Sequence, residues 1–393
     1  MKFASNAVTA LAVTLAIQAF TSLAATATAV LAPEVGPAVG LSPKLIGIFV
    51  GVLYLGAMLT SLASGGFIER YGPIRVSQVC AILCACGLVL TTGPAWAFLV
   101  APAVIGIGYG PITPASSQLL ARTASPRTMA LTFSIKQTGV PLGAALAGAL
   151  LPLIAVGHGW RAAIWTVAGS GVLVALLAQP TREGLDVGLS REHRVSLERL
   201  LAPLKLVMRS PKLLELTTTG FVYAATQACL LSFLVIYMNQ ELERTLVSAG
   251  LALTVATIGG VVGRISWGLL ADRWIAPRRM LGMLGVVAGV CAVGTSSFGP
   301  AWPGFVEGLV CALFGMTAIG WNGVQLAEVA RHSPRGQAGA VTGASGFITF
   351  AGVVVGPPVF ALMATITGSF ATGFGAMGLA SLACGAWLLR RRK

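Results

Sequence analysis

The sequence is poor in charged residues, and acidic residues are the scarcest of them. Asp, Glu, Lys and Arg make up 10% of the 393 residues, and only 12 residues are Asp or Glu, whereas the mean hydropathy is +0.85. A soluble globular chain carries about 25% charged residues. Apolar runs of about 20 residues, each long enough to cross the hydrocarbon core of a bilayer, follow one another along the chain. The composition excludes a soluble protein and predicts a multi-pass membrane protein.

The sequence also lacks the residue clusters that metal sites and enzyme active sites require. None of the seven cysteines stands in a C-x-x-C pair, and the three histidines (His158, His193 and His332) all fall between apolar runs. No serine lies in a G-x-S-x-G motif. Cysteine in an apolar run usually acts as a small hydrophobic residue. We therefore expect no metal, no cofactor and no disulfide framework, and we expect that the protein is not an intramembrane enzyme.

Basic residues outnumber acidic ones, and their placement predicts the topology. The net charge is +14, and the basic residues gather in alternate breaks between the apolar runs, as in the segment 273–279. The other breaks hold few basic residues, namely Lys44, Arg161 and Arg244. Because positive residues accumulate in cytoplasmic loops, we expect both termini in the cytoplasm and the protein in a bacterial inner membrane. This spread of charge forms no patch on a soluble domain, so we expect no nucleic-acid partner.

Apolar runs and polar breaks predict twelve transmembrane helices in an all-α membrane protein. The first run lies near the N-terminus, but it exceeds the about 7–15 apolar residues of a signal peptide, so we count it as a helix. The expected helices cover residues 7–31, 44–66, 76–95, 97–120, 129–154, 161–179, 213–239, 246–270, 280–298, 304–327, 338–364 and 370–390. The long polar break at 181–212 reads as a cytoplasmic linker with a short surface helix. It divides the chain into six-helix bundles at 1–180 and 213–393.

The two halves of the chain repeat each other in two loops. After the second expected helix the chain reads GGFIERYGPIR (65–75), and after the eighth it reads GLLADRWIAPRR (268–279). The tripeptide SPR occurs at 125–127 and again at 333–335, between corresponding helices of the two halves. Parallel repeats of six helices build one large class of transporters. Self-similarity in two corresponding loops therefore predicts that architecture.

The repeated motif resembles the loop between helices 2 and 3 of the major facilitator superfamily, with the pattern G-x-x-x-[DE]-R-x-G. The resemblance covers the whole chain and implies two pseudo-symmetric six-helix bundles. It implies gating roles for Gly65, Glu69, Arg70, Gly72 and Arg75 in the first copy and for Gly268, Asp272 and Arg273 in the second. Glu69 replaces the commoner aspartate, and Pro73 with Ile74 stand where basic residues are frequent. These departures predict a weaker gating loop in the first half.

A carboxylate in this loop is suited to gating. At the end of one helix it can accept hydrogen bonds from the exposed N–H groups that begin a neighbouring helix, where the helix dipole favours negative charge. Such a contact breaks when two bundles rock apart, so it stabilises one of the inward-open and outward-open states relative to the other. The alternative is that the motif only makes a tight basic turn that sets the topology.

Two cations lie within the apolar runs, Lys136 in TFSIKQTGVPLG and Arg264 in VVGRISWGLL. A lysine in the membrane costs about 2.5–3.5 kcal/mol on insertion scales. The repeat places Ala344 and Ser61 at the equivalent positions, so packing alone does not require either cation. The alternative for each is that the long side chain extends along its helix to the membrane surface.

The functional interpretation of these cations is an anion site. In the fold that this sequence resembles, helices 5 and 8 are neighbours across the bundle interface, so an anion that joined the two cations would relieve their repulsion. The segment R-x-x-x-G-L at Arg264 is similar to the helix 8 arginine segment of monocarboxylate and oxalate carriers, which implies that Arg264 binds a substrate carboxylate. Those carriers often have an aspartate one turn earlier, where this chain has Gly260.

Polar residues on the helices that face the central cavity in this fold are further candidates for substrate contact. They are Gln18, Tyr109, Tyr223, Gln227, Trp321, Asn322 and Gln325, together with Gln137 beside Lys136. An aromatic ring beside hydrogen-bonding amides suits a small organic anion. For each of these residues, interhelical packing is the alternative role.

Acidic residues avoid the helix centres. Those near helix ends include Glu34, Glu215, Glu241, Glu243, Glu307 and Glu328. A carrier of cations needs a carboxylate at mid-membrane, so this distribution argues against a cationic substrate. It leaves Glu307, or a protonatable substrate itself, as the candidate proton carrier.

Two pairs of glycines predict close helix contacts. Gly139 with Gly143, and Gly352 with Gly356, form G-x-x-x-G pairs that let two helices approach closely. The run GVPLGAALAG matches the glycine-proline motif of superfamily antiporters only in part, so we do not infer efflux.

We therefore expect a secondary transporter of the symporter type that carries a small organic anion, with a carboxylate as the substrate class. We expect a monomer in the lipid bilayer, with protons as the candidate coupling ion. Two rivals remain open. One is an exporter of a neutral drug or metabolite, and the other is a membrane sensor that binds a ligand without moving it.

Overall fold

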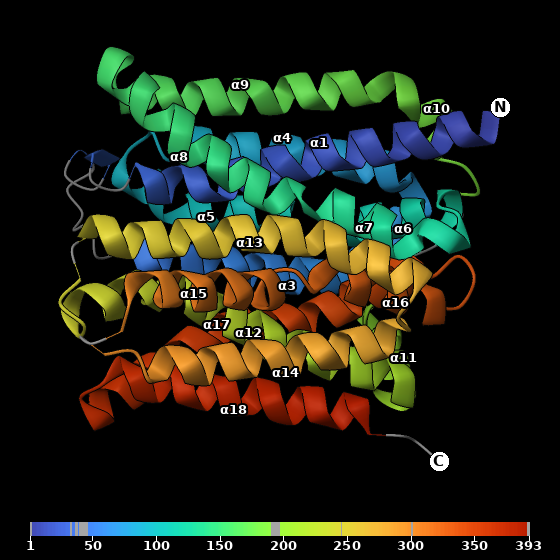
Figure 1. Cartoon of the computed structure of the whole chain (residues 1–393). Coiled ribbons are helices and arrows are strands. Elements are labelled where there is room, and N and C mark those ends of the chain that lie inside the picture. The colour runs from blue at the N-terminus through green and yellow to red at the C-terminus, as the bar shows by residue number, and fades with distance from the viewer. Residues whose placement is uncertain are drawn as a thin grey trace. The chain divides into compact units, whose positions relative to one another are not determined.

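The protein is helical throughout the part of the chain that the computed structural model describes (Figure 1). The described residues are 2–31, 34–35, 38, 46–189, 197–244, 246–299 and 302–390. Within these ranges there is no strand, and 12 helical segments are long and apolar enough to cross a membrane. The expected all-α membrane fold and its number of spans are confirmed. Lys44, His193 and the tail 391–393 lie outside the described residues.

Six spans come from the first half of the chain. They are α1 (Lys2–Val30), α3 (Ile46–Tyr71), α4 (Pro73–Leu90), α5 with α6 (Ala95–Tyr109 and Ile112–Thr123), α7 with α8 (Met129–Gln137 and Gly139–His158) and α9 (Trp160–Ala178). Helix α3 continues through the first copy of the repeated motif, and Gly72 ends it with a φ of 94°. Pro73 then begins α4, where its missing N–H leaves no helical bond unmade.

The other six spans come from the second half. They are α12 (Pro211–Gln240), α13 (Leu246–Arg273), α14 (Pro277–Ser296), α15 with α16 (Gly304–Ala318 and Asn322–His332), α17 (Ala338–Thr367) and α18 (Phe370–Leu389). Between the halves, the described part of the linker holds α10 (Arg182–Leu185) and α11 (Leu197–Arg209). Val207 of α11 is buried whereas Lys205 and Arg209 are exposed, so α11 is the surface helix expected from the sequence.

Three spans are interrupted along their length. The interruptions lie at Gly110–Pro111 between α5 and α6, at Thr138 between α7 and α8, and at 319–321 between α15 and α16. Proline explains the first two, because Pro111 and Pro141 carry no N–H for the carbonyl four residues earlier. Hydropathy continues across all three breaks, so the apolar pattern did not predict them.

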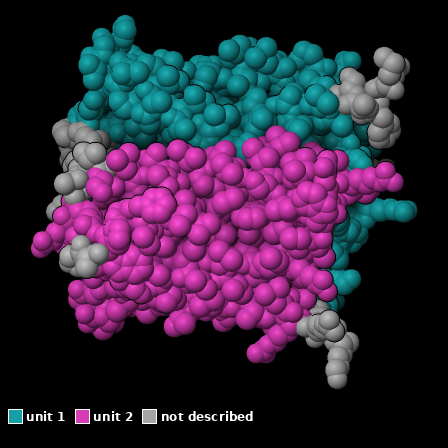
Figure 2. All heavy atoms as spheres, viewed as in Figure 1, with its two compact units in different colours: residues 1–125, 136–213, 329–347 teal, residues 126–135, 214–328, 348–393 magenta. Residues whose placement is uncertain are grey.

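The chain forms two compact units, which are coloured separately in Figure 2. Unit 1 comprises residues 1–125, 136–213 and 329–347, and unit 2 comprises residues 126–135, 214–328 and 348–393. Each unit therefore consists mostly of one half of the chain and includes one short segment of the other half. We call 126–135 and 329–347 the exchanged segments. The bundle boundaries at the linker, as expected from the sequence, stay a prediction.

Both G-x-x-x-G pairs lie at close helix contacts, as predicted. In unit 1, a Cβ on Gly143 would lie 2.1 Å from the carbonyl oxygen of Ala19 in α1, so α8 and α1 touch through their backbones. In unit 2, a Cβ on Gly352 would lie 2.2 Å from the carbonyl oxygen of Phe221 in α12. Such small residues allow the dense packing that holds membrane helices together. Glycines also line the contact between α14 and α18, which run side by side in unit 2 (Figure 1).

We predict that Gly143→Ala destabilises the protein, because the new methyl group would collide with the α1 backbone. Overpacking of this kind costs about 1–3 kcal/mol, so the apparent Tm in detergent should fall by several degrees. Gly148→Ala on the same helix is the control, since nothing lies within 4 Å of its Cβ position. Equal Tm values for the two variants would contradict the tight α1–α8 contact.

Candidate functional site

Lys136 is buried, and its ammonium group bonds side chains of unit 1. Its side chain is 1% exposed, and its Nζ donates hydrogen bonds to Gln18 Oε1 at 2.6 Å and to Gln137 Oε1 at 3.1 Å. Gln18 Oε1 also accepts a bond from the Thr113 hydroxyl at 3.4 Å. The structure thus brings together three of the predicted site residues, and the snorkelling alternative for Lys136 is wrong.

The interruption at Thr138 gives Lys136 its electrostatic setting. Lys136 lies in the last turn of α7, which ends at Gln137 inside the fifth span. The C-terminus of a helix carries a partial negative charge that favours a cation within about one turn. Discontinuous helices whose ends point at charged ligands are a recurring feature of transporter binding sites. The interruption thus places Lys136 beside a helix end within the fifth span.

Arg264 is equally buried, and a second helix interruption explains part of its surroundings. Its side chain is 1% exposed, and its Nε donates to the carbonyl oxygen of Ile319 at 3.1 Å. Ile319 lies in the break between α15 and α16, where carbonyl groups lose their helical partners. Trp267 Nε1 bonds the carbonyl of Met316 at 2.7 Å at the same break. The Nε–H of Arg264 thus bonds the span formed by α15 and α16.

The aromatic candidates of unit 2 are buried and pack against each other. Tyr223 and Trp321 meet edge to face with ring centroids 5.7 Å apart. The Tyr223 hydroxyl donates to the carbonyl of Leu281 at 2.8 Å, and Gln325 Nε2 donates to the carbonyl of Leu216 at 3.3 Å. These two hydrogen bonds direct Tyr223 and Gln325 toward neighbouring helices.

The remaining candidates are half-buried. Gln227 on α12 and Asn322 at the start of α16 are of intermediate exposure in unit 2. Tyr109, at the end of α5 in unit 1, meets Tyr54 edge to face at 6.1 Å. Their roles in substrate binding stay predictions.

Asp272 makes the helix-start contact that the repeated motif indicated. Its two carboxylate oxygens accept hydrogen bonds from the backbone N–H groups of Ala130 at 3.0 Å and Leu131 at 2.7 Å, in the first turn of α7. A Cβ on Gly268 would lie 2.5 Å from Ser134 Oγ, so α13 and α7 are in close contact here. Arg273 is exposed. The gating role of these residues stays a prediction.

The first copy of the motif has a different environment. A Cβ on Gly65 would lie 2.6 Å from Ala340 Cβ, so α3 packs against the start of α17 within unit 1. Glu69 is half-buried, and the guanidinium of Arg70 lies over the Tyr71 ring, 5.3 Å from its centroid. The first copy thus shares the close glycine contact of the second copy.

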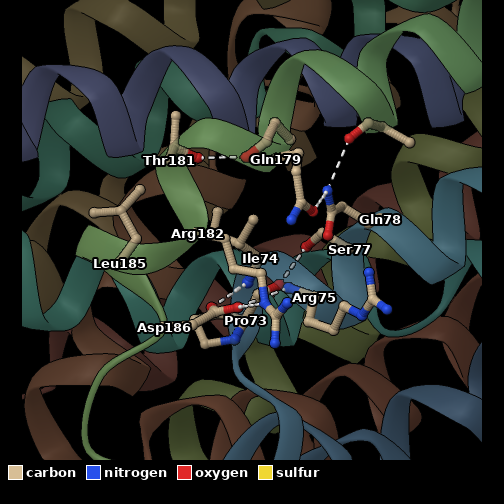
Figure 3. Close-up of polar contacts among 12 residues, drawn as sticks. Pro73, Ile74, Arg75, Ser77, Gln78, Gln179, Thr181, Arg182, Leu185 and Asp186 are labelled. Carbon is tan, nitrogen blue, oxygen red and sulfur yellow. Dashed lines mark hydrogen bonds and ion pairs between the residues drawn. The ribbon is translucent and has the colours of Figure 1, made fainter.

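Asp186, which the sequence reasoning missed, caps the helix that follows the first motif (Figure 3). Its carboxylate accepts hydrogen bonds from the N–H groups of Ile74 at 2.8 Å and Arg75 at 3.0 Å, at the start of α4. Burial raises the pKa of the Asp186 carboxyl above its ordinary value, although these two N–H groups and the nearby Arg182 and Arg122 act in the opposite direction. The signal in the sequence that could have indicated this contact was an acidic residue directly after the sixth span.

Across the described ranges, no group of three or more His, Cys, Asp or Glu side chains is placed to hold a metal ion.

The sequence profile of the Major Facilitator Superfamily matches residues 14–357. The chain belongs to the Major Facilitator Superfamily. Proteins of this superfamily are transporters rather than enzymes. Among solved structures, this superfamily chain is similar to the Escherichia coli fucose:proton symporter, with a TM-score of 0.77 and 16% identity over 97% of this chain and 98% of that one. This likeness shows the shared fold.

Matches to curated relatives cover only part of the chain. The chain is 29% identical to the 3-(3-hydroxy-phenyl)propionate transporter of Escherichia coli (strain K12) over 265 residues, which are 65% of this chain and 63% of that protein. It is 26% identical to a chloroplastic protein of Oryza sativa subsp. japonica, named as probable anion transporter 4, over 58% of this chain and 42% of that protein. The match thus spans less than two thirds of each relative.

We predict that Gly72→Ala destabilises the protein by disturbing the Asp186 cap. A Cβ on Gly72 would lie 2.3 Å from Asp186 Cγ, and the φ of 94° is unfavourable for alanine. Gly188→Ala is the control, because Gly188 shares a positive φ of 72° but has nothing within 4 Å. The apparent Tm should fall further for Gly72→Ala, and equal losses would show that the strained backbone alone is responsible.

Proposed function

We propose that the protein is a secondary active transporter that moves a small organic anion bearing a carboxylate across the bacterial inner membrane by alternating access. The observation that carries this proposal is the presence of one fully buried cation within a membrane span of each unit, Lys136 in unit 1 and Arg264 in unit 2. A charged side chain in the membrane is costly and marks a substrate or ion pathway by default.

The surroundings of Lys136 support an anionic ligand. The amides of Gln18 and Gln137 orient the ammonium group through their oxygens, but an amide brings no negative charge. A carboxylate would add the Coulomb attraction between opposite charges to such a hydrogen bond, which the neutral amides cannot supply. The two glutamines then act as neutral partners that hold the lysine in place when the substrate leaves.

The surroundings of Arg264 support a carboxylate in particular. A guanidinium is planar and presents paired N–H donors that match the two oxygens of a carboxylate. The bond from Nε to the carbonyl of Ile319 fixes the orientation of that plane. A preoriented guanidinium loses less freedom when it binds its ligand.

The named substrates of the curated relatives agree with this class. The Escherichia coli relative is named for a propionate, which is a carboxylate, and the Oryza sativa relative is named for anions. We include proton coupling in the proposal, with the substrate acid or Glu307 as the carrier. Glu307 is buried and forms an ion pair with Arg244 at 2.7 Å.

Uptake into proteoliposomes tests the proposed function. The panel holds labelled mono- and dicarboxylates, including an arylpropionate, and each acid is paired with its uncharged amide. We expect uptake of at least one acid and not of its amide, with faster uptake under an inward pH gradient. Uptake of acid and amide alike would favour the exporter of neutral compounds, and binding without uptake would favour the sensor.

We predict that both cations are needed for substrate binding. Loss of a charged partner from a desolvated site costs about 2–5 kcal/mol, so Arg264→Ala and Lys136→Ala should each weaken binding by more than about tenfold. Arg264→Lys should remain strongly impaired despite its charge, because an ammonium cannot bind both carboxylate oxygens, whereas Lys136→Arg should be milder. The measurement is the Kd of the purified variants.

Two further variants test whether the cations act through their charge or through their support of the helix interruptions. Trp267→Phe removes the hydrogen bond to Met316 at the α15–α16 break but leaves both cations in place. Lys136→Gln keeps a donor for Gln18 but removes the charge. Substrate binding should survive Trp267→Phe and fail in Lys136→Gln. The reverse result would mean that the cations only support the helix interruptions.

We predict that Asp272→Asn slows transport while the substrate Kd stays within a few-fold of wild type. The reason is that the carboxylate affects the equilibrium between conformations rather than the contacts of the binding site. Glu241→Gln is the control. The Glu241 carboxylate accepts bonds from Phe370 N at 2.7 Å and from the Ser369 hydroxyl at the start of α18, outside the exchanged segments. A full transport rate in Asp272→Asn would remove Asp272 from the gate.

A further inference from the structure

The two exchanged segments occupy equivalent places in the two units. The SPR repeats at 125–127 and 333–335 stand at or beside the two segments and bring Leu131 into correspondence with Gly339. In unit 2, the segment 126–135 packs against α13 and α16. In unit 1, the segment 329–347 packs against α3 and α6. Each unit therefore holds a helix start that belongs to the other half of the chain.

In unit 2, the incoming helix start is held by steric fit and by charge. Ser134 is wedged between two glycines, since a Cβ on Gly268 or on Gly323 would lie 2.5 Å or 2.1 Å from its hydroxyl oxygen. The Asp272 carboxylate adds bonds to the N–H groups of Ala130 and Leu131. Both contacts have to break before the segment can leave unit 2.

In unit 1, the steric fit is similar. A Cβ on Gly343 of α17 would lie 2.3 Å from the carbonyl oxygen of Ser61 in α3, and the Ser61 hydroxyl bonds the carbonyl of Gly343 at 3.1 Å. A Cβ on Gly339 would lie 3.0 Å from Gln118 Cβ and 3.1 Å from the carbonyl oxygen of Pro114 in α6. The start of α17 is thus in direct contact with both helices.

The polar contact in unit 1 comes from Gln118, a residue that neither the repeat nor the motif singled out. Gln118 lies on α6 and is 8% exposed. Its Nε2 donates to the carbonyl of Gly336 at 2.6 Å, and its Oε1 accepts from the N–H of Gly339 at 2.8 Å. One side-chain amide therefore bonds both sides of the turn that begins α17. Gly336 makes that turn with a φ of 80°.

We propose that Gln118 is a positioning residue of the gate and the neutral counterpart of Asp272. Both side chains bind the backbone N–H of the corresponding residue, Leu131 or Gly339, in the segment that arrives from the other half. The contact in unit 2 is charge-assisted, whereas the contact in unit 1 joins neutral groups and is weaker. This inference rests on the proposed alternating access, in which both exchanged segments leave their units when the gate opens.

Hydrogen exchange of backbone amides, without substrate, tests the proposal on the full protein in lipid nanodiscs. Gln118→Met keeps the length of the side chain and removes both bonds to the turn. We expect amide exchange in peptides covering 336–347 to rise about fivefold or more, as the loss of two neutral hydrogen bonds allows. We expect exchange to rise in peptides covering 126–135 as well, because one gating transition releases both segments.

Gln78→Met is the matched control. Gln78 is a buried glutamine of unit 1 whose Nε2 bonds the carbonyl of Ala175 at 2.8 Å and Gln179 Oε1 at 2.9 Å, away from both exchanged segments. Its replacement should leave exchange in 126–135 unchanged. The apparent Tm of each variant shows whether it has folded, and Gln118→Glu, which retains an acceptor for Gly339, should give a smaller rise than Gln118→Met.

The outcomes separate this proposal from the proposed function. A rise confined to 336–347 would show that Gln118 only packs its own turn and would overturn the gating role, as would no rise at all. A joint rise in both segments supports the gating role. A joint rise in a protein that transports no acid of the uptake panel would support the gating role of Gln118 and contradict the proposed carboxylate substrate.

Discussion

The cost of an unsatisfied backbone group in hydrocarbon is the constraint on which this structure depends. Each peptide group in a span must find a partner inside the protein, which explains why the spans are helices. Where a span is interrupted, other side chains bind the freed groups. The Ile319 carbonyl binds Arg264, and the Met316 carbonyl binds Trp267. The polar residues of the membrane interior thus have a backbone role beside their proposed role in transport.

The same constraint applies at helix starts, where the unsatisfied groups are N–H donors instead of carbonyl acceptors. Within the part of the chain that the structure describes, the carboxylates that accept bonds from such groups include Asp186 at α4, Asp272 at α7 and Glu241 at α18. The bonds are charge-assisted and lie near the ends of the spans, where a carboxylate is less costly than at mid-membrane. The start of α17 uses the amide of Gln118 instead. Pseudo-symmetry therefore holds for the close backbone contacts, whereas the polar groups differ between the halves.

The buried cations connect the fold to the proposed transport function. The break that ends α7 at Gln137 places Lys136 at a helix C-terminus, and the break after α15 gives Arg264 a carbonyl partner. Helix interruption and buried charge thus occur together in both halves, although the repeated sequence has Ala344 and Ser61 at the corresponding positions. Under the proposed function, a ligand that changed the hydrogen bonding of these groups would act directly on the interrupted helices.

The sequence by itself determined the spans, the pseudo-repeat and the kind of contact that Asp272 makes, because hydropathy, glycine spacing and repeated loops are local signals. It also placed Gly143 and Gly352 at close helix contacts. Only the tertiary structure decided that Lys136 bonds Gln18, that Arg264 bonds Ile319, and that Asp186 and Gln118 hold helix starts far away in the chain. The physical reason is that the packing of separate helices determines each of these partners. The periodicity of a single helix shows which face is apolar, but it does not specify which helix will pack against that face.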